Sequence, residues 1–333
     1  MQFHTVKQKE IIMTDLYQKI GEMGLIPVVK LKSVEDALPL GRALMQGGLP
    51  CAEITFRTAA AEESIRAVTK AFPTMLIGAG TVLTCDQADS AINAGAKFLV
   101  SPGLNPKVVT HCLEKGYTII PGICNPTEIE AALDLGLKVV KFFPAEASGG
   151  LPMIKALAEP YGNLMFMPTG GINPNNLKAY LDHPKVLACG GSFMVKPQMI
   201  MAGDFTEIER LTREAVMQML GFEFGHIGIN TEGEEEGIRI AESLCGLFGL
   251  ESKISNSSIF CGSIFELMKQ CGPGKNGHIA IATNYLDRAV AYLERQGVGF
   301  DTKSMKYGAD GKPAAIYLKD SVGGFALHLV QKK

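Results

Sequence analysis

The chain has 333 residues, of which 47% are hydrophobic and 20% are charged, and its formal net charge is −2. These values are typical of a globular protein with two domains. The small net charge argues against nucleic acid or an anionic membrane surface as the main partner, and no run approaches the ~20 consecutive apolar residues of a membrane span.

The N-terminal stretch MQFHTVKQKEIIMTDL has no apolar core followed by a small-residue cleavage site. We therefore expect no signal peptide and a cytoplasmic protein. Met13 is a candidate start, with residues 1–12 as an extension that carries no recognisable signal. Eight cysteines are scattered without any Cys-x-x-Cys spacing. Their even number permits four disulfides, but the scatter in a large, apolar chain favours reduced thiols.

The first two thirds of the chain repeat one unit, which consists of a short apolar run, a turn and a helical pattern. The apolar runs predict eight strands, at residues 25–31, 51–56, 76–82, 98–101, 118–123, 139–143, 164–167 and 186–188. Strands that alternate with helices form right-handed βαβ units around a parallel sheet. Eight of them in one domain favour an α/β fold of the closed (β/α)8 type, the TIM barrel, over an open doubly wound sheet.

One lysine, Lys141, lies inside the apolar run 139–143, which Pro144 ends because proline cannot donate to a strand ladder. Side chains alternate along a strand, so Val139, Lys141 and Phe143 share one face. A lysine among apolar neighbours loses hydration, which favours its neutral, nucleophilic form and so a Schiff base with a ketone. The alternative is a structural lysine that snorkels at the strand end.

Residues with useful chemistry follow several of the predicted strands, where a barrel of this type carries its active site. Glu53 is a candidate general base, and Arg57 offers a planar fork for a carboxylate. Taken singly, each residue also has a structural interpretation, such as a tight turn for a glycine. Backbone N–H groups that could hold a phosphate are expected at Gly170, Gly171, Gly190, Gly191 and Ser192.

Six segments, GGLPCAEITFRT, GAGTVL, SPG, KFFPAE, PTGGI and GGS, occur in this order. Together they resemble the 2-keto-3-deoxy-6-phosphogluconate aldolases, a class I family that includes 4-hydroxy-2-oxoglutarate aldolases. The resemblance spans about residues 16–213 and implies a Schiff base on Lys141 with Glu53 as proton acceptor and donor. It also implies small 2-keto acid substrates, pyruvate as one product, no cofactor and a homotrimer. The pocket residues that it implies are Arg57, Thr81, Pro102 and Thr169, with Gly170, Gly171 and Ser192 around a phosphate.

Beyond Gly221 the pattern changes to two similar halves. Each half begins with a histidine in a strand-like run, at His226 and His278, and continues into a helix and short strands. This layout resembles the glyoxalase/vicinal-oxygen-chelate superfamily and implies a smaller α+β domain of paired βαβββ modules. The predicted domains are therefore residues 14–220 and 222–333.

In metal-binding members of that superfamily, four strand residues converge on one divalent ion. The corresponding residues here are His226, Glu266, His278 and His328. Imidazole with carboxylate suits Zn²⁺, Ni²⁺, Fe²⁺ or Mn²⁺, although the last position is a carboxylate in most glyoxalases. The alternative is a set of unconnected strand residues without a metal.

The leading prediction is a Schiff-base aldolase. Its rivals are metal-dependent glyoxalase or dioxygenase chemistry in the second domain, a ligand-sensing role for that domain, and a non-catalytic phosphate-binding barrel.

Overall fold

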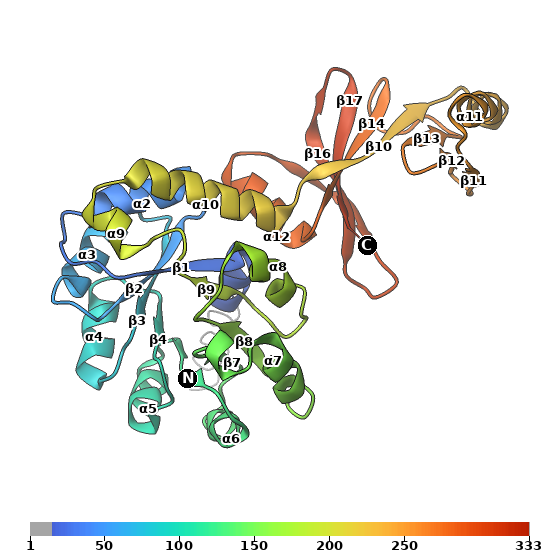
Figure 1. The fold of residues 1–333 in the computed structure, drawn as a ribbon. Helices are drawn as coiled ribbons and strands as arrows, with labels where there is room; N and C mark the ends of the chain where they lie inside the picture. Colours follow the sequence, from blue (N-terminus) through green and yellow to red (C-terminus); the bar gives the residue numbers. More distant parts are fainter. Residues whose placement is uncertain (1–14, 333) are drawn as a thin grey trace, which may run out of the picture. The chain divides into compact units, whose positions relative to one another are not determined.

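The computed structural model describes residues 15–332. The candidate start at Met13, residues 1–12 and the first residue of the predicted N-terminal domain lie outside this range. The chain divides into two compact units, Met1–Val216 and Met217–Lys333 (Figure 1). No helix in the described part is long and apolar enough to cross a membrane.

Parallel strands form the centre of the N-terminal unit. They are β1 (Leu25–Val29), β2 (Cys51–Thr55), β3 (Leu76–Gly80), β4 (Phe98–Val100), β5 (Ile119–Ile120), β6 (Gly122–Ile123), β7 (Val139–Phe142), β8 (Met165–Pro168) and β9 (Cys189–Gly191). Six of them pair in the order β5-β4-β3-β2-β1-β9, and three in the order β6-β7-β8. Pro121 alone separates β5 from β6, and isolated parallel bridges join Phe166 to Val186 and Thr169 to Gly190. The parallel sheet is therefore curled.

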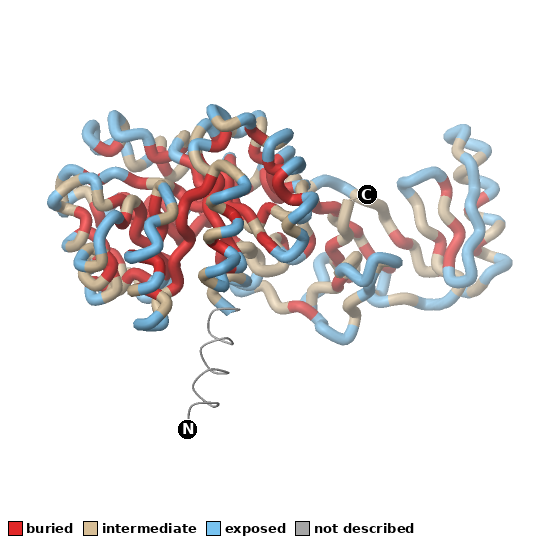
Figure 2. Tube along the Cα trace, turned by 90° about the horizontal axis from the view of Figure 1, so that it is seen from below, coloured by how far each residue is buried: buried red, intermediate tan, exposed pale blue. Residues whose placement is uncertain are grey.

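Helices lie around these strands (Figure 1). Three of them begin in the same way, because Asn105, Asn125 and Asn173 each accept a hydrogen bond from a backbone N–H of the first turn and proline follows. The buried residues, in red in Figure 2, gather on the strands and on the inner faces of the helices. The helices are α2 (Ala37–Gln46), α3 (Ala61–Ala71), α4 (Cys85–Asn93), α5 (Pro106–Lys115), α6 (Pro126–Asp134), η1 (Glu146–Ser148), α7 (Gly150–Ala158), α8 (Pro174–Leu181), α9 (Pro197–Met201) and α10 (Phe205–Leu220).

The strand expected at residues 186–188 is misplaced in the sequence prediction. The strand at this place is β9, Cys189–Gly191, and Val186 makes only an isolated bridge. Two of the three residues of β9 are glycines, which contribute nothing to an apolar pattern. The periodicity therefore pointed to the apolar residues just before the strand.

The C-terminal unit repeats the order strand, helix and three strands. The first copy is β10 (Glu223–Asn230), α11 (Glu234–Phe248), β11 (Ser252–Ile254), β12 (Ser258–Cys261) and β13 (Phe265–Met268). The second copy is β14 (Gly277–Thr283), α12 (Leu286–Arg295), β15 (Phe300–Tyr307), β16 (Pro313–Val322) and β17 (Phe325–Gln331). All eight strands form one sheet in the order β11-β12-β13-β10-β14-β17-β16-β15, in which the antiparallel pair β10 and β14 joins the two copies.

Candidate active site

Lys141 and Glu53 form a buried pair inside the N-terminal unit. Lys141 lies on β7 and Glu53 on β2, and these two strands are not neighbours in either sheet. Lys141 Nζ donates to Glu53 Oε1 at 3.3 Å, and the two side chains are 5% and 1% exposed. The pair therefore meets across the interior of the curled sheet, where a charged lysine requires a partner.

Both members of the pair keep atoms available to a ligand. Glu53 Oε2 is buried and has no hydrogen-bond partner among the described residues. The Nζ of Lys141 lies 5.2 Å from the centroid of the Phe143 ring, which shields one side of the amine. Because a buried polar atom without a partner is costly, an unsatisfied carboxylate oxygen beside an amine indicates a place for a substrate hydroxyl or a water.

A glycine makes room for this carboxylate. Gly80 ends β3 and pairs with Thr55 of β2, and a Cβ added at Gly80 would lie 2.1 Å from Glu53 Oε1. Any side chain at this position would therefore displace Glu53. We did not predict a role for Gly80, although glycines at alternate positions of one strand, Gly78 and Gly80, are a signal of close approach.

Arg57 and Thr81 come together at the ends of β2 and β3. Arg57 Nε donates to Thr81 Oγ1 at 3.1 Å, while the Arg57 side chain remains exposed. Thr81 has a φ of 57°, which is unusual for a β-branched residue and is the kind of strain that collects at functional sites.

Pro102 lies against the strand that precedes the lysine strand. A Cβ added at Gly122 would lie 2.0 Å from the Pro102 carbonyl oxygen, and Gly122 of β6 pairs with Lys141 of β7. The loop after β4 is thus packed against β6, the neighbour of the strand that carries the lysine.

Thr169 and Gly190 bring the ends of β8 and β9 together. They form a parallel bridge, and a Cβ at Gly190 would lie 2.4 Å from Thr169 Oγ1. Ser192 follows at the exposed end of β9. Lys141 of β7 pairs with Met167 of β8, and Thr169 comes directly after the last residue of β8. Thr169 is therefore two residues beyond the partner of the lysine.

Gly170 and Gly171 form a loop, residues 169–173, that we call the glycine loop. Both glycines have positive φ, 102° and 83°. The Gly170 carbonyl accepts from the Glu146 N–H, and the Gly171 carbonyl accepts from side-chain amides. The N–H groups of both glycines donate to no group in the described part of the chain. An anion is the natural partner for such free backbone donors.

The C-terminal unit gathers the other four predicted residues into one cluster, which we call the histidine cluster. His226 on β10, Glu266 on β13, His278 on β14 and His328 on β17 come from four strands. Glu266 Oε2 lies 3.1 Å from His226 Nε2 and 3.0 Å from His278 Nε2, and these two nitrogens are 3.2 Å apart. One ring nitrogen from each histidine lies within 4.8 Å of the others.

The electrostatics of the histidine cluster favour an ionised Glu266 and a neutral His328. Burial alone would raise the pKa of Glu266, but hydrogen bonds with His226 and His278 hold it well below its usual range. Burial, His278 and His226 lower the pKa of His328 to about 3. His278 Nδ1 and His328 Nε2 are buried and have no hydrogen-bond partner among the described residues. A carboxylate together with three converging imidazole nitrogens fits the donor set of a divalent cation.

A glycine again makes room for a functional side chain. Gly228 of β10 pairs with His278, and a Cβ at Gly228 would lie 2.0 Å from Cε1 of the His278 ring. The imidazole therefore lies directly over the backbone of the neighbouring strand.

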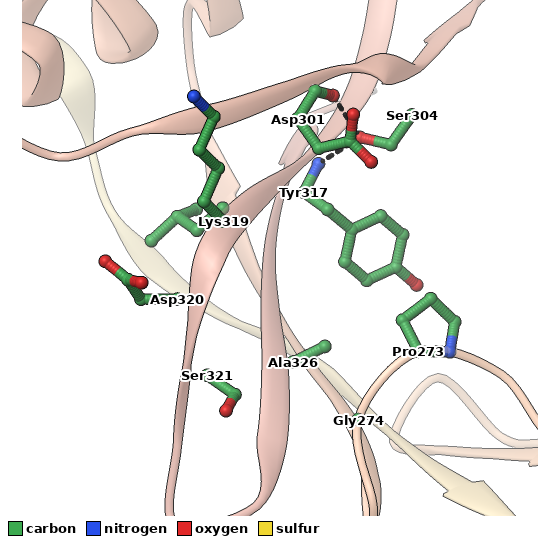
Figure 3. Close-up of a pocket in the computed structure, with 10 residues that line it drawn as sticks. Pro273, Gly274, Asp301, Ser304, Tyr317, Lys319, Asp320, Ser321 and Ala326 are labelled. Carbon is green, nitrogen blue, oxygen red and sulfur yellow. Dashed lines mark hydrogen bonds between the residues drawn. The ribbon is translucent and has the colours of Figure 1, made fainter.

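A cavity of about 440 Å³ is lined in part by Tyr317, whose ring also contacts His278 and His328 of the histidine cluster. The Tyr317 ring is stacked on His328 with a centroid distance of 4.6 Å. Burial, and to a smaller extent the negative charge of Glu266, raises the pKa of Tyr317 to about 12. Figure 3 shows the ring beside Pro273, with Ser304 hydrogen-bonded to the Tyr317 backbone and to Asp301. Sequence patterns gave no indication of this tyrosine.

Comparison with known proteins gives matches to the N-terminal part of the chain. The family model "KDPG and KHG aldolase" matches residues 16–211. A 2-dehydro-3-deoxy-phosphogluconate aldolase from Treponema pallidum is 54% identical over 209 residues, which are 63% of this chain and 99% of the relative. The KHG/KDPG aldolase of Escherichia coli is 43% identical over 58% of this chain and 90% of its own length.

Solved structures give the same result. The KDPG aldolase of Legionella pneumophila, with pyruvate captured as a covalent carbinolamine, has a TM-score of 0.58 and 37% identity over 60% of this chain and 97% of its own. The 2-keto-3-deoxy-6-phosphogluconate aldolase of Zymomonas mobilis ZM4, with 3-phosphoglycerate, has a TM-score of 0.56 and 38% identity over 60% of this chain and 94% of its own.

Proposed function

The chain belongs to the KDPG and KHG aldolase family, and we propose that its N-terminal unit cleaves 2-keto-3-deoxy-6-phosphogluconate to pyruvate and glyceraldehyde 3-phosphate through Lys141. Like the relatives, it is a class I aldolase, a lyase that works through a Schiff base. The observation that carries the proposal is the buried contact of Lys141 Nζ with Glu53 Oε1 at 3.3 Å. The shorter substrate 4-hydroxy-2-oxoglutarate, which yields pyruvate and glyoxylate, is proposed as a second substrate.

The reaction can be written with these two side chains. The neutral amine of Lys141 adds to the C2 ketone, and loss of water from the carbinolamine gives an iminium. Glu53 accepts the proton of the C4 hydroxyl, the C3–C4 bond breaks, and its electron pair forms the enamine of pyruvate. Glu53 then returns the proton to C3, and water hydrolyses the imine to release pyruvate and Lys141.

The surrounding residues supply binding. Arg57 is exposed at the end of β2 and offers its fork to the substrate carboxylate, next to Thr81 at 3.1 Å. Pro102 and Thr169 would line the keto-acid pocket. The free N–H groups of the glycine loop, with Ser192 at the end of β9, would hold the phosphate.

The test of the proposed function is a trapping experiment. Borohydride reduction in the presence of pyruvate should attach a reduced pyruvate adduct to Lys141, identified by peptide mass spectrometry. Lys138→Ala, which alters an exposed lysine just before the same strand, is the matched control. Absence of an adduct at Lys141, or full aldolase activity in Lys141→Ala, would refute the proposal.

The finer architecture is proposed with the function. The curled sheet and its bridges support a closed (β/α)8 barrel for residues 14–220. The repeated order of strand, helix and three strands supports a glyoxalase/vicinal-oxygen-chelate-like domain of paired βαβββ modules for residues 222–333. A homotrimer is also proposed, and light scattering on the purified full chain would test it.

The second candidate function is a divalent-cation site in the C-terminal unit. His226, His278, His328 and Glu266 would hold the ion. The assignment is supported by one ring nitrogen from each histidine within 4.8 Å of the others and by Glu266 Oε2 at 3.1 and 3.0 Å from His226 Nε2 and His278 Nε2. A bound cation supplies Lewis acid chemistry. The cavity beside Tyr317 offers space for a small molecule, so glyoxalase-like or dioxygenase-like chemistry and ligand sensing are the roles to distinguish.

Metal analysis tests this second function. The full chain, dialysed against Zn²⁺, Ni²⁺, Fe²⁺ or Mn²⁺ and then against buffer, should retain one ion per chain. His278→Ala should abolish retention, whereas His111→Ala, a histidine of the N-terminal unit, should leave it unchanged. Only trace metal in the wild-type chain would refute the site.

A further inference from the structure

The last residue of the KFFPAE segment, Glu146, has no part in the chemistry described above, yet it contacts the glycine loop. The N–H of Glu146 donates to the Gly170 carbonyl at 3.1 Å. A Cβ added at Gly171 would lie 2.4 Å from Glu146 Cγ, so this side chain covers the glycine. The loop after β7 and the loop after β8 are thus in direct contact.

A tyrosine holds Glu146 in this place. The hydroxyl of Tyr180 donates to Glu146 Oε1, and the Tyr180 residue is 1% exposed. Burial, followed by the hydrogen bond to Glu146, raises the pKa of Tyr180, so its hydroxyl remains a donor. Tyr180 lies in α8, the helix that begins directly after the glycine loop. A buried ring therefore holds the carboxylate in place through its hydroxyl.

The opposite side of the glycine loop is fixed as well. The side-chain amides of Asn173 and Asn176 donate to the Gly171 carbonyl at 3.0 and 3.1 Å. With the Gly170 carbonyl taken by Glu146, both glycine carbonyls are occupied, and the N–H groups are the free polar groups of the loop. The orientation of those donors depends on every one of these contacts, because glycine itself imposes no preferred conformation.

We infer that Tyr180 and Glu146 are positioning residues that orient the glycine loop and thereby set the preference for phosphorylated over unphosphorylated substrates. This inference rests on the proposed function. The pair touches neither Lys141 nor Glu53 through any contact in the described part of the chain, so it acts on the phosphate end of the substrate. A hydrogen bond to a carboxylate is strong enough for its loss to change a loop conformation.

The decisive variant is Tyr180→Phe, which removes the hydrogen bond but keeps the buried ring and the charge of Glu146. We expect kcat/KM for 2-keto-3-deoxy-6-phosphogluconate to fall about tenfold, mainly through KM, and the inhibition constant of inorganic phosphate to rise by a similar factor. The rate of borohydride trapping of pyruvate at Lys141 should change less than twofold, because pyruvate has no phosphate. Tyr161→Phe, which removes another Tyr–Glu hydrogen bond of the same unit, should change none of these values.

A second pair of variants distinguishes position from charge. Glu146→Gln keeps an acceptor for Tyr180 and should resemble the wild type, whereas Glu146→Ala should resemble Tyr180→Phe. A gain of phosphate affinity in Glu146→Ala would mean that the carboxylate merely repels the phosphate, and would overturn the inference. An equal loss of phosphorylated-substrate cleavage and pyruvate trapping in Tyr180→Phe, or no loss of either, would also overturn it. A wild-type chain that traps no pyruvate would instead refute the proposed function.

Discussion

Replacing Gly80 by alanine should strongly lower aldolase activity, although neither of the two reacting side chains, Lys141 and Glu53, is itself replaced. The added Cβ would lie 2.1 Å from Glu53 Oε1, 2.7 Å from its Cγ and 2.8 Å from its Cδ. Ordinary contacts to a carbon begin at about 3.4 Å, so the carboxylate must move by about 1 Å or more. Glu53 is fully buried and is held by its contact with Lys141, so the displacement changes the geometry of that pair.

A displacement of about 1 Å in an active site lowers the rate by about 10²-fold, which is about 2.7 kcal/mol of transition-state stabilisation. We therefore expect kcat for aldol cleavage in Gly80→Ala to fall by about two orders of magnitude. Release of pyruvate, followed with a coupled lactate dehydrogenase assay, measures it. Overpacking should also lower the free energy of unfolding by about 1–3 kcal/mol, which thermal denaturation would show.

Gly162→Ala is the matched control, because a Cβ at Gly162 would meet no heavy atom within 4 Å and its φ is not positive. This variant should keep wild-type activity and stability. A folded Gly80→Ala protein with more than half of the wild-type kcat would refute the reasoning, because Glu53 would then work from a displaced position.

Three further outcomes follow from the buried groups. Lys141→Met leaves Glu53 buried without its partner and should lower the free energy of unfolding by about 3 kcal/mol in urea titrations. The double variant Lys141→Met/Glu53→Gln should regain part of that loss. Equal stability of the single and the double variant would contradict this. Gly228→Ala should weaken zinc binding at least tenfold in equilibrium dialysis, because its Cβ would lie 2.0 Å from the His278 ring, while Gly246→Ala, with open space around it, should bind as the wild type does. Zinc at about 100 times its dissociation constant should stabilise the native C-terminal unit by about 2.7 kcal/mol and so raise the melting temperature of this unit. A chelator should reverse that rise. A melting temperature that changes with neither zinc nor chelator would exclude the site.

The sequence was most informative where apolar periodicity and chemistry coincide. The run at 139–143 predicted the strand β7, Val139–Phe142, and its one lysine is the residue that the structure places against Glu53. The helix expected after the strand-like run at His226 is α11, Glu234–Phe248. Both segments are long or strongly patterned, and local preferences and tertiary packing agree in them.

The sequence was least informative at two kinds of residue: glycines, and residues whose role depends on a side chain from a distant part of the chain. Gly80 and Gly228 matter because of the groups that lie over them, and those groups come from other strands. Tyr317 follows a strand pattern like many other aromatic residues, and only pairing of β16 with β17 places it opposite His328. Such relations depend on register, which a single sequence does not contain.

Three glycines packed against residues of the proposed pocket have a consequence for attempts to change the substrate. Gly80, Gly122 and Gly190 each face an atom within 2.4 Å of where a Cβ would stand. In a saturation-mutagenesis map they should appear as positions that accept almost no replacement, although they perform no chemistry. Substrate range is therefore better varied at Ser192, an exposed residue after β9 whose side chain can change without displacing the buried pair. Libraries for new aldehyde acceptors would be best concentrated at this position, because the proposed phosphate site belongs to the aldehyde part of the substrate.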